Sequence, residues 1–173
     1  ILQFIDKIFQ LVDDELTESF VTKLIQTSLI LLESLDKKHL DYFADMFIKQ
    51  FWDNEAFKSE SPYYAIVTAP MAALVRRKPE LIPSLIEMLM INIKSQVERG
   101  GGSVRDATLQ GRDIKLALYL FTFNEVLRFS YSELIPYKKK LQEFIKYLIE
   151  NISNPVLDNV TTIVINDILS SLT

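Results

Sequence analysis

The chain has 173 residues, of which 49 % are hydrophobic and 24 % are charged, and its net charge is −4. This length and composition predict one globular domain and exclude an intrinsically disordered chain. The acidic balance argues against a protein whose whole surface binds nucleic acid, although it leaves room for a local basic patch. The sequence contains no cysteine, which excludes disulfides and thiolate metal sites.

No segment resembles a membrane span or a targeting signal. The longest nearly uncharged run, 116–124, is far shorter than the roughly 20 residues that a spanning helix needs. We therefore expect an intracellular protein, cytoplasmic or nuclear, with no membrane contact. The first residue is Ile1 rather than a start methionine, and no basic leader is present, so we predict that 1–173 is a fragment of a longer protein.

The placement of glycine indicates the fold class. All four glycines lie between positions 100 and 111. Outside that window no glycine offers the positive φ angle that tight β-hairpins usually require, and no stretch alternates as a half-buried strand does. The sequence therefore predicts an all-α protein.

Eight helices are expected in chain order. Apolar residues at a spacing of three and four predict the first helix over 1–12 and the second from about 17 to 35. The third is expected to begin at Asp36 and to reach position 52. The fourth, over 61–78, carries a proline in its first turn, where the missing N–H is not needed, and it ends before Pro79.

The second half of the chain repeats this pattern. The fifth helix, over 80–97, tolerates Pro83 because that residue falls in the first turn. The sixth, over about 112–129, is apolar on nearly all sides, which predicts burial between several neighbours. The seventh, over 133–152, has the cleanest apolar stripe, and the eighth is expected over 154–172.

An internal repeat organises these helices. The sequence Glu-Leu-Ile-Pro occurs at 80–83 and again at 133–136, and each copy opens a predicted helix. Without the glycine-containing loop between them, the offset is about 40 residues, the period of helical-hairpin repeats. We therefore predict a single helical-repeat domain over 1–173, an α-solenoid of about four stacked antiparallel hairpins of the HEAT type.

Two family resemblances follow from these motifs. The segment 79–89 resembles the first helix of a HEAT-type repeat. A narrower resemblance is carried by Tyr64-Ala65, Pro79-Glu80-Leu81, Gln96, Glu98 and Gly111 to Lys115. With these residues, roughly 61–173 resembles the middle domain of translation initiation factor four-G, which the large subunit of the nuclear cap-binding complex shares. That resemblance implies a role in messenger-RNA metabolism, with a helicase or RNA as partner. This sequence departs from the family by one residue inserted in the glycine-to-lysine motif.

The loop over 98–110 is expected to be flexible and to lie between the two helices of one hairpin. Its Gly100–Ser103 run is not a phosphate-binding loop, because it lacks the Gly-Lys-Ser/Thr ending and a preceding strand. Two interpretations stay open: a natural flexible loop, or an artificial linker in place of a longer disordered insertion.

Two basic clusters stand next to the two Glu-Leu-Ile-Pro elements. Equivalent joints of stacked repeats line up along one edge, so we expect the clusters to form part of a basic strip that binds a partner. The alternative is that each cluster only solvates a helix end and complements its dipole. The residues of the predicted basic strip are Arg76, Arg77, Lys78, Arg112, Lys115, Lys138, Lys139 and Lys140.

Nothing in the sequence predicts catalysis. His39 is the only histidine and is expected at the surface, so neither a zinc site nor a histidine-activated nucleophile can be assembled. The carboxylates are spread over solvated helix faces, with no pair suited to acid–base chemistry. We expect no catalytic residue, no cofactor, no metal and no small-molecule substrate.

The leading functional hypothesis is a scaffold that binds protein partners, with the resemblance implying messenger-RNA metabolism or translation. Two alternatives stay open. One is direct RNA binding through the basic strip. The other is a structural segment of a longer HEAT solenoid in transport or chromatin machinery.

Overall fold

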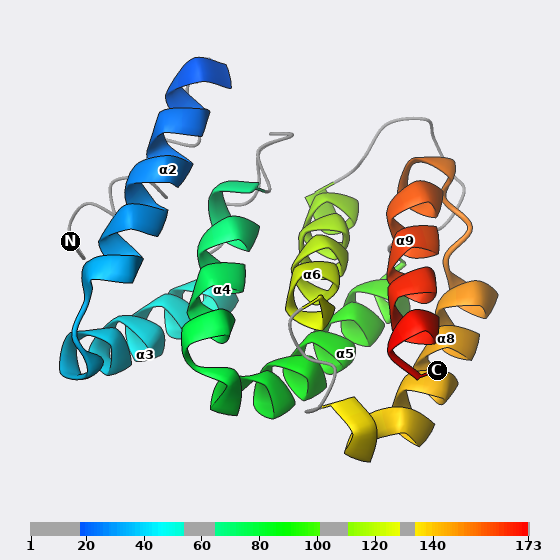
Figure 1. The fold of residues 1–173 in the computed structure, drawn as a ribbon. Coiled ribbons are helices and arrows are strands. Elements are labelled where there is room, and N and C mark those ends of the chain that lie inside the picture. Colours follow the sequence, from blue (N-terminus) through cyan, green and yellow to red (C-terminus); the bar gives the residue numbers. More distant parts are fainter. Residues whose placement is uncertain (1–17, 54–64, 101–110, 129–133, 173) are drawn as a thin grey trace.

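The computed structural model of the protein describes residues 18–53, 65–100, 111–128 and 134–172 (Figure 1). Its α-helices are α2 (Glu18–Ser34), α3 (Lys37–Asp53), α4 (Ala65–Arg77), α5 (Ile82–Glu98), α6 (Gly111–Leu127), α8 (Lys138–Asn151) and α9 (Pro155–Leu172). No strand occurs within these ranges, which confirms the all-α prediction. The helix predicted over 1–12, the start predicted at 61 and most of the predicted loop lie outside the described residues.

Asp36 caps the start of α3. One carboxylate oxygen of Asp36 accepts the backbone N–H of His39 at 2.9 Å, and the imidazole Nδ1 lies 2.8 Å from the same carboxylate. The hydrogen bond from that N–H is the main reason that the pKa of the Asp36 carboxyl lies below its usual range. A negative charge at this position also complements the dipole at the helix N-terminus. His39 is exposed, as predicted.

The two helices that begin with Glu-Leu-Ile-Pro start later than predicted. Each is preceded by one turn of 3-10 helix, η1 (Pro79–Leu81) before α5 and η2 (Ile135–Tyr137) before α8. Tight turns of this kind are common where a helix begins, and a proline there gives up no helical hydrogen bond. The regular helices therefore begin after the tight turn, α5 at Ile82 and α8 at Lys138, although Leu134, just before η2, is also α-helical.

The helices form two layers (Figure 1). One layer is a row in which α2 contacts α4, α4 contacts α6, and α6 contacts α9. The other layer holds α3, α5 and α8, with α5 packed against α6 and α8 against α9. The pairs α5–α6 and α8–α9 are thus successive helical hairpins, and α3 takes the corresponding place before α4. This arrangement is the α-solenoid that the repeat predicted.

The core lies between the two layers. Leu116, Leu120 and Phe123 of α6 have no exposed surface, and α6 contacts α4, α5 and α9, which confirms that this helix is buried between several neighbours. From the other layer, α8 contributes Phe144, whose ring centroid lies 5.3 Å from that of Phe123. Among the described helices, none combines the length and the apolar composition of a membrane span.

Candidate functional site

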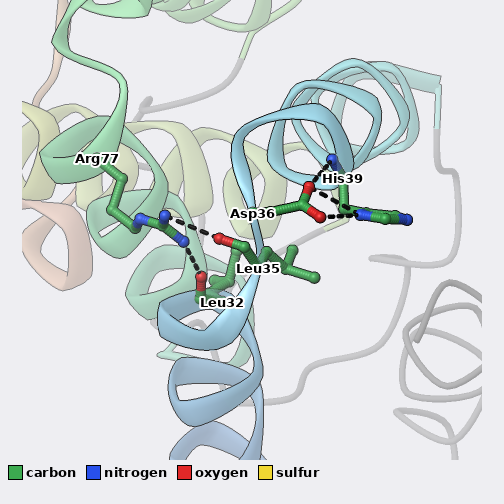
Figure 2. Close-up of polar contacts among 5 residues, drawn as sticks. All are labelled: Leu32, Leu35, Asp36, His39 and Arg77. Atoms are coloured by element: carbon green, nitrogen blue, oxygen red, sulfur yellow. Dashed lines mark hydrogen bonds and ion pairs between the residues drawn. The ribbon is translucent and has the colours of Figure 1, made fainter.

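The first basic cluster, Arg76 to Lys78, lies at the corner where α4 ends and η1 begins. Figure 2 shows Arg77 reaching from this corner to the end of α2, where its guanidinium donates to the backbone carbonyls of Leu32 and Leu35. The bond to Leu35 is 2.9 Å long. The last carbonyls of a helix have no partner within the helix, so Arg77 provides a C-terminal cap for α2 from a neighbouring helix.

The other two members of this cluster also bind within the chain. Arg76 lies 3.2 Å from the carboxylate of Glu33 on α2. The ammonium of Lys78, on a side chain only 14 % exposed, pairs with Asp41 on α3 and lies 3.6 Å from Glu80. The hydrogen bond to Asp41 raises the pKa of Lys78 above its usual range. These three residues therefore join the end of α4 to the corner between α2 and α3.

Removing the Arg77 cap is expected to destabilise the fold. Arg77→Ala leaves two carbonyls at the end of α2 without their charged donor, and we expect the free energy of unfolding to fall by about 1–2 kcal/mol in urea denaturation. Lys139→Ala, which removes an exposed lysine of the second cluster, serves as the control and is expected to stay within about 0.5 kcal/mol of wild type. Equal losses in the two variants would contradict the capping role.

The second basic cluster forms the first turn of α8 and is exposed. The ammonium of Lys140 lies 2.7 Å from a carboxylate oxygen of Glu87 on α5 and 5.5 Å from the centre of the Tyr137 ring. Its hydrogen bond to Glu87 is the main reason that the pKa of Lys140 lies above its usual range. Both clusters lie at the same edge of the two layers, where α4 ends and α8 begins (Figure 1).

The remaining members of the predicted basic strip lie elsewhere. Arg112 and Lys115 belong to the first turns of α6, and α6 begins at the opposite edge from the end of α4 (Figure 1). A helix of 17 residues spans roughly 25 Å, so this distance separates the two edges. Lys115 is also half-buried. The structure thus brings Arg76–Lys78 and Lys138–Lys140 to one edge and does not bring Arg112 and Lys115 to them; partner binding by any of them stays a prediction.

The internal repeat reappears as contacts between α5 and α8. Lys140 pairs with Glu87, and the Tyr147 hydroxyl donates to the backbone carbonyl of Lys94 at 3.4 Å; both pairs are 53 positions apart in the chain. This is the offset between the two Glu-Leu-Ile-Pro elements. The same positions of successive hairpins therefore face each other, so α5 and α8 stack in register.

A groove opens between α5 and α8 along this contact. Its volume is about 280 Å³, and it is lined by Glu87, Met90, Ile91, Lys94, Lys140 and Glu143. Apart from Lys140, these residues were not among the predicted site residues. The offset of 53 positions between the two repeats could have identified these lining residues from the sequence, because it aligns Glu87 with Lys140 and Lys94 with Tyr147. Within the described part of the chain, no group of three or more side chains is placed to hold a metal ion.

Comparisons with known proteins identify the family. The family model described as "Proteasome activator complex subunit 4, mid HEAT repeats region" matches residues 1–173. The protein named "Proteasome activator BLM10" from Saccharomyces cerevisiae (strain ATCC 204508 / S288c) is 48 % identical over 170 residues. That alignment covers 98 % of this chain and 8 % of the length of the yeast protein.

These matches confirm the HEAT-type repeat and correct the narrower resemblance. The likeness to the middle domain of translation initiation factor four-G, and with it the role in messenger-RNA metabolism, is not supported. The motifs that carried it, such as a Pro-Glu-apolar helix start, suit the beginning of any stacked helical hairpin. The match is also to the repeat region of an activator and not to a catalytic family. The chain belongs to the family of the mid HEAT-repeat region of proteasome activator complex subunit 4.

Proposed function

We propose that this chain is a scaffold segment within the longer HEAT solenoid of a proteasome activator, and that it acts by holding the parts of that activator in place on the proteasome. The observation that carries the proposal is the match of the family over residues 1–173. The in-register stacking of α5 on α8 supports it, because a solenoid keeps its shape only if successive repeats stack in a fixed register.

The protein partner that this proposal implies is the proteasome, which the names of the family and of the yeast relative contain. The sequence also left open direct RNA binding through the basic strip. We do not propose it, because Arg77 and Lys78 are engaged within the chain and the comparisons give RNA no support. The intracellular location expected from the sequence stays a prediction that agrees with a proteasome partner.

The proposal predicts that unfolding this segment disables the whole activator. Each repeat of a solenoid contacts only its neighbours, so a collapsed repeat interrupts the path between the two ends. In the full-length protein, Leu120→Asp places a charge at a position with no exposed surface and is expected to unfold the segment. Stimulation of peptide hydrolysis by purified proteasomes, measured with a fluorogenic peptide, is expected to fall at least tenfold.

The control is Ile149→Asp, which changes a side chain that is 64 % exposed on α8 and is expected to keep stimulation within about twofold of wild type. A wild-type protein that does not stimulate the proteasome would refute the proposed function. Full stimulation by the Leu120→Asp protein, with the segment shown by limited proteolysis to be unfolded, would refute the scaffold role of this segment.

A further inference from the structure

The two layers join successive hairpins in different ways. In one layer α6 and α9 pack closely against each other. Both helices carry apolar side chains with no exposed surface: Leu120 and Phe123 on α6, and Val164 and Ile168 on α9. In the other layer α5 and α8 approach each other far less closely, and the groove of about 280 Å³ lies between them. The two hairpins are therefore held together mainly through α6 and α9.

Polar side chains bridge the gap between α5 and α8. Lys140 lies 2.7 Å from a carboxylate oxygen of Glu87, and these two side chains are 61 % and 43 % exposed. The Lys94 ammonium lies 5.1 Å from the centre of the Tyr147 ring, whose hydroxyl reaches the Lys94 carbonyl only at 3.4 Å, a long hydrogen bond. An exposed ion pair shifts an equilibrium by no more than about fivefold and is weakened by salt. These bridges are therefore weak compared with the buried apolar contact of α6 with α9.

An aromatic contact ties α8 to the opposite layer. The ring of Phe144, which is 1 % exposed, lies 5.3 Å from the ring of Phe123 on α6. Helix α6 is also the helix against which α9 packs. Both helices of the α8–α9 hairpin are thus anchored on α6, so the hairpin can rotate about α6 as one body without α8 leaving the core.

We propose that the Lys140–Glu87 ion pair and the Lys94–Tyr147 contact form a reversible clasp, and that the α8–α9 hairpin rotates about its contact with α6 when the clasp opens. Opening increases the spacing of α5 and α8 and leaves that of α6 and α9 unchanged, so the curvature of the solenoid changes at this hairpin. Ionic strength shifts the equilibrium, because salt screens the exposed ion pair and not the buried apolar contact. The inference rests on the contacts of the two layers and not on the proposed function.

The test measures the distance between α5 and α8 in the full-length protein. Spin labels are attached to p-acetylphenylalanine in place of Met88 on α5 and Lys146 on α8, which are both exposed and do not line the groove. Pulsed electron–electron double resonance then gives the distribution of distances. Between about 0.1 M and about 1 M NaCl the screening length falls from about 10 Å to about 3 Å. The ratio of long to short distances is expected to rise with salt by up to about fivefold.

Reversal of charge distinguishes the clasp from a general loosening of the fold. Lys140→Glu places two carboxylates opposite each other and is expected to give the long distances already at low salt. Adding Glu87→Lys restores an ion pair of reversed polarity and is expected to restore the short distances. Lys139→Ala is the matched control, because it removes a neighbouring exposed lysine that does not line the groove, and it is expected to behave as wild type. All three changes are at exposed positions, so the variants are expected to fold, which circular dichroism checks.

A second pair of labels, in place of Lys146 on α8 and Asn166 on α9, reports on the hairpin itself. Both positions are exposed, and the distance between them is expected to stay the same at low and high salt. The proposal is overturned if neither salt nor Lys140→Glu changes the distances between α5 and α8, or if the double variant keeps the long distances. It is also overturned if Lys139→Ala has the effect of Lys140→Glu, or if the distances between α8 and α9 change as much as those between α5 and α8.

Discussion

Replacing Phe123 by alanine is expected to lower the free energy of unfolding by about 3–5 kcal/mol. The ring has no exposed surface, and it packs against Phe144 of α8 with the two planes tilted by 59°. Helix α6 is enclosed by α4, α5 and α9, so the surrounding helices cannot all move inward to fill the space that the ring leaves. A cavity that stays open adds its own cost to the loss of the apolar contact.

Equilibrium urea unfolding followed by circular dichroism measures this effect. Ile149→Ala is the control, since that side chain is 64 % exposed, and its loss is expected to change stability by no more than about 0.5 kcal/mol. A loss below about 1.5 kcal/mol in Phe123→Ala would show that the helices around α6 rearrange, and it would contradict a rigid junction between the two layers.

At high pH the protein is expected to lose stability through Tyr119. Its side chain is 1 % exposed, and burial raises the pKa of its hydroxyl from 10.0 to about 12, with the charge of Arg99 acting in the opposite direction. The folded state therefore favours the neutral phenol. Below pH 10 the hydroxyl is protonated in both states and contributes nothing to the pH dependence. Between pH 10 and 12 only the unfolded chain ionises, so stability falls as the pH rises, by about 3 kcal/mol in total.

The comparison of wild type with Tyr119→Phe isolates the effect of the Tyr119 hydroxyl, because the lysines and the other tyrosines titrate in both proteins. Between pH 9 and pH 11.5, wild type is expected to lose about 2 kcal/mol more than the variant in urea unfolding. Identical losses in both proteins would mean that the hydroxyl reaches water in the folded state.

The helices within the described residues were predictable because each carries a local signal. The third helix was expected to begin at Asp36, and in the structure the carboxylate of Asp36 accepts the backbone N–H of His39 at the start of α3. The register of stacking was predictable as well, since the two copies of Glu-Leu-Ile-Pro have the same offset as the contact between Glu87 and Lys140. The starts of α5 and α8 were placed too early, because a helical stripe does not distinguish a 3-10 turn from the first turn of an α-helix.

The basic strip was less predictable. The sequence shows that Arg76, Arg77 and Lys78 are charged, but not what lies across from them. Two of their partners, Glu33 on α2 and Asp41 on α3, are close to them only because the helices pack together. The position of Arg112 depends on the direction in which α6 runs, which its own residues do not specify.

The sequence by itself determined the all-helical class, the approximate positions of the described helices and the offset of the repeat, because helix periodicity and prolines act within a few residues of one another. Only the tertiary structure decided which charged side chains pair with one another inside the fold. It paired Lys140 of α8 with Glu87 of α5 and placed the ammonium of Lys94 over the ring of Tyr147. The physical reason is that ion pairs between repeats depend on the distance between helices, and that distance is set by the packing of buried side chains such as Phe123 and Phe144.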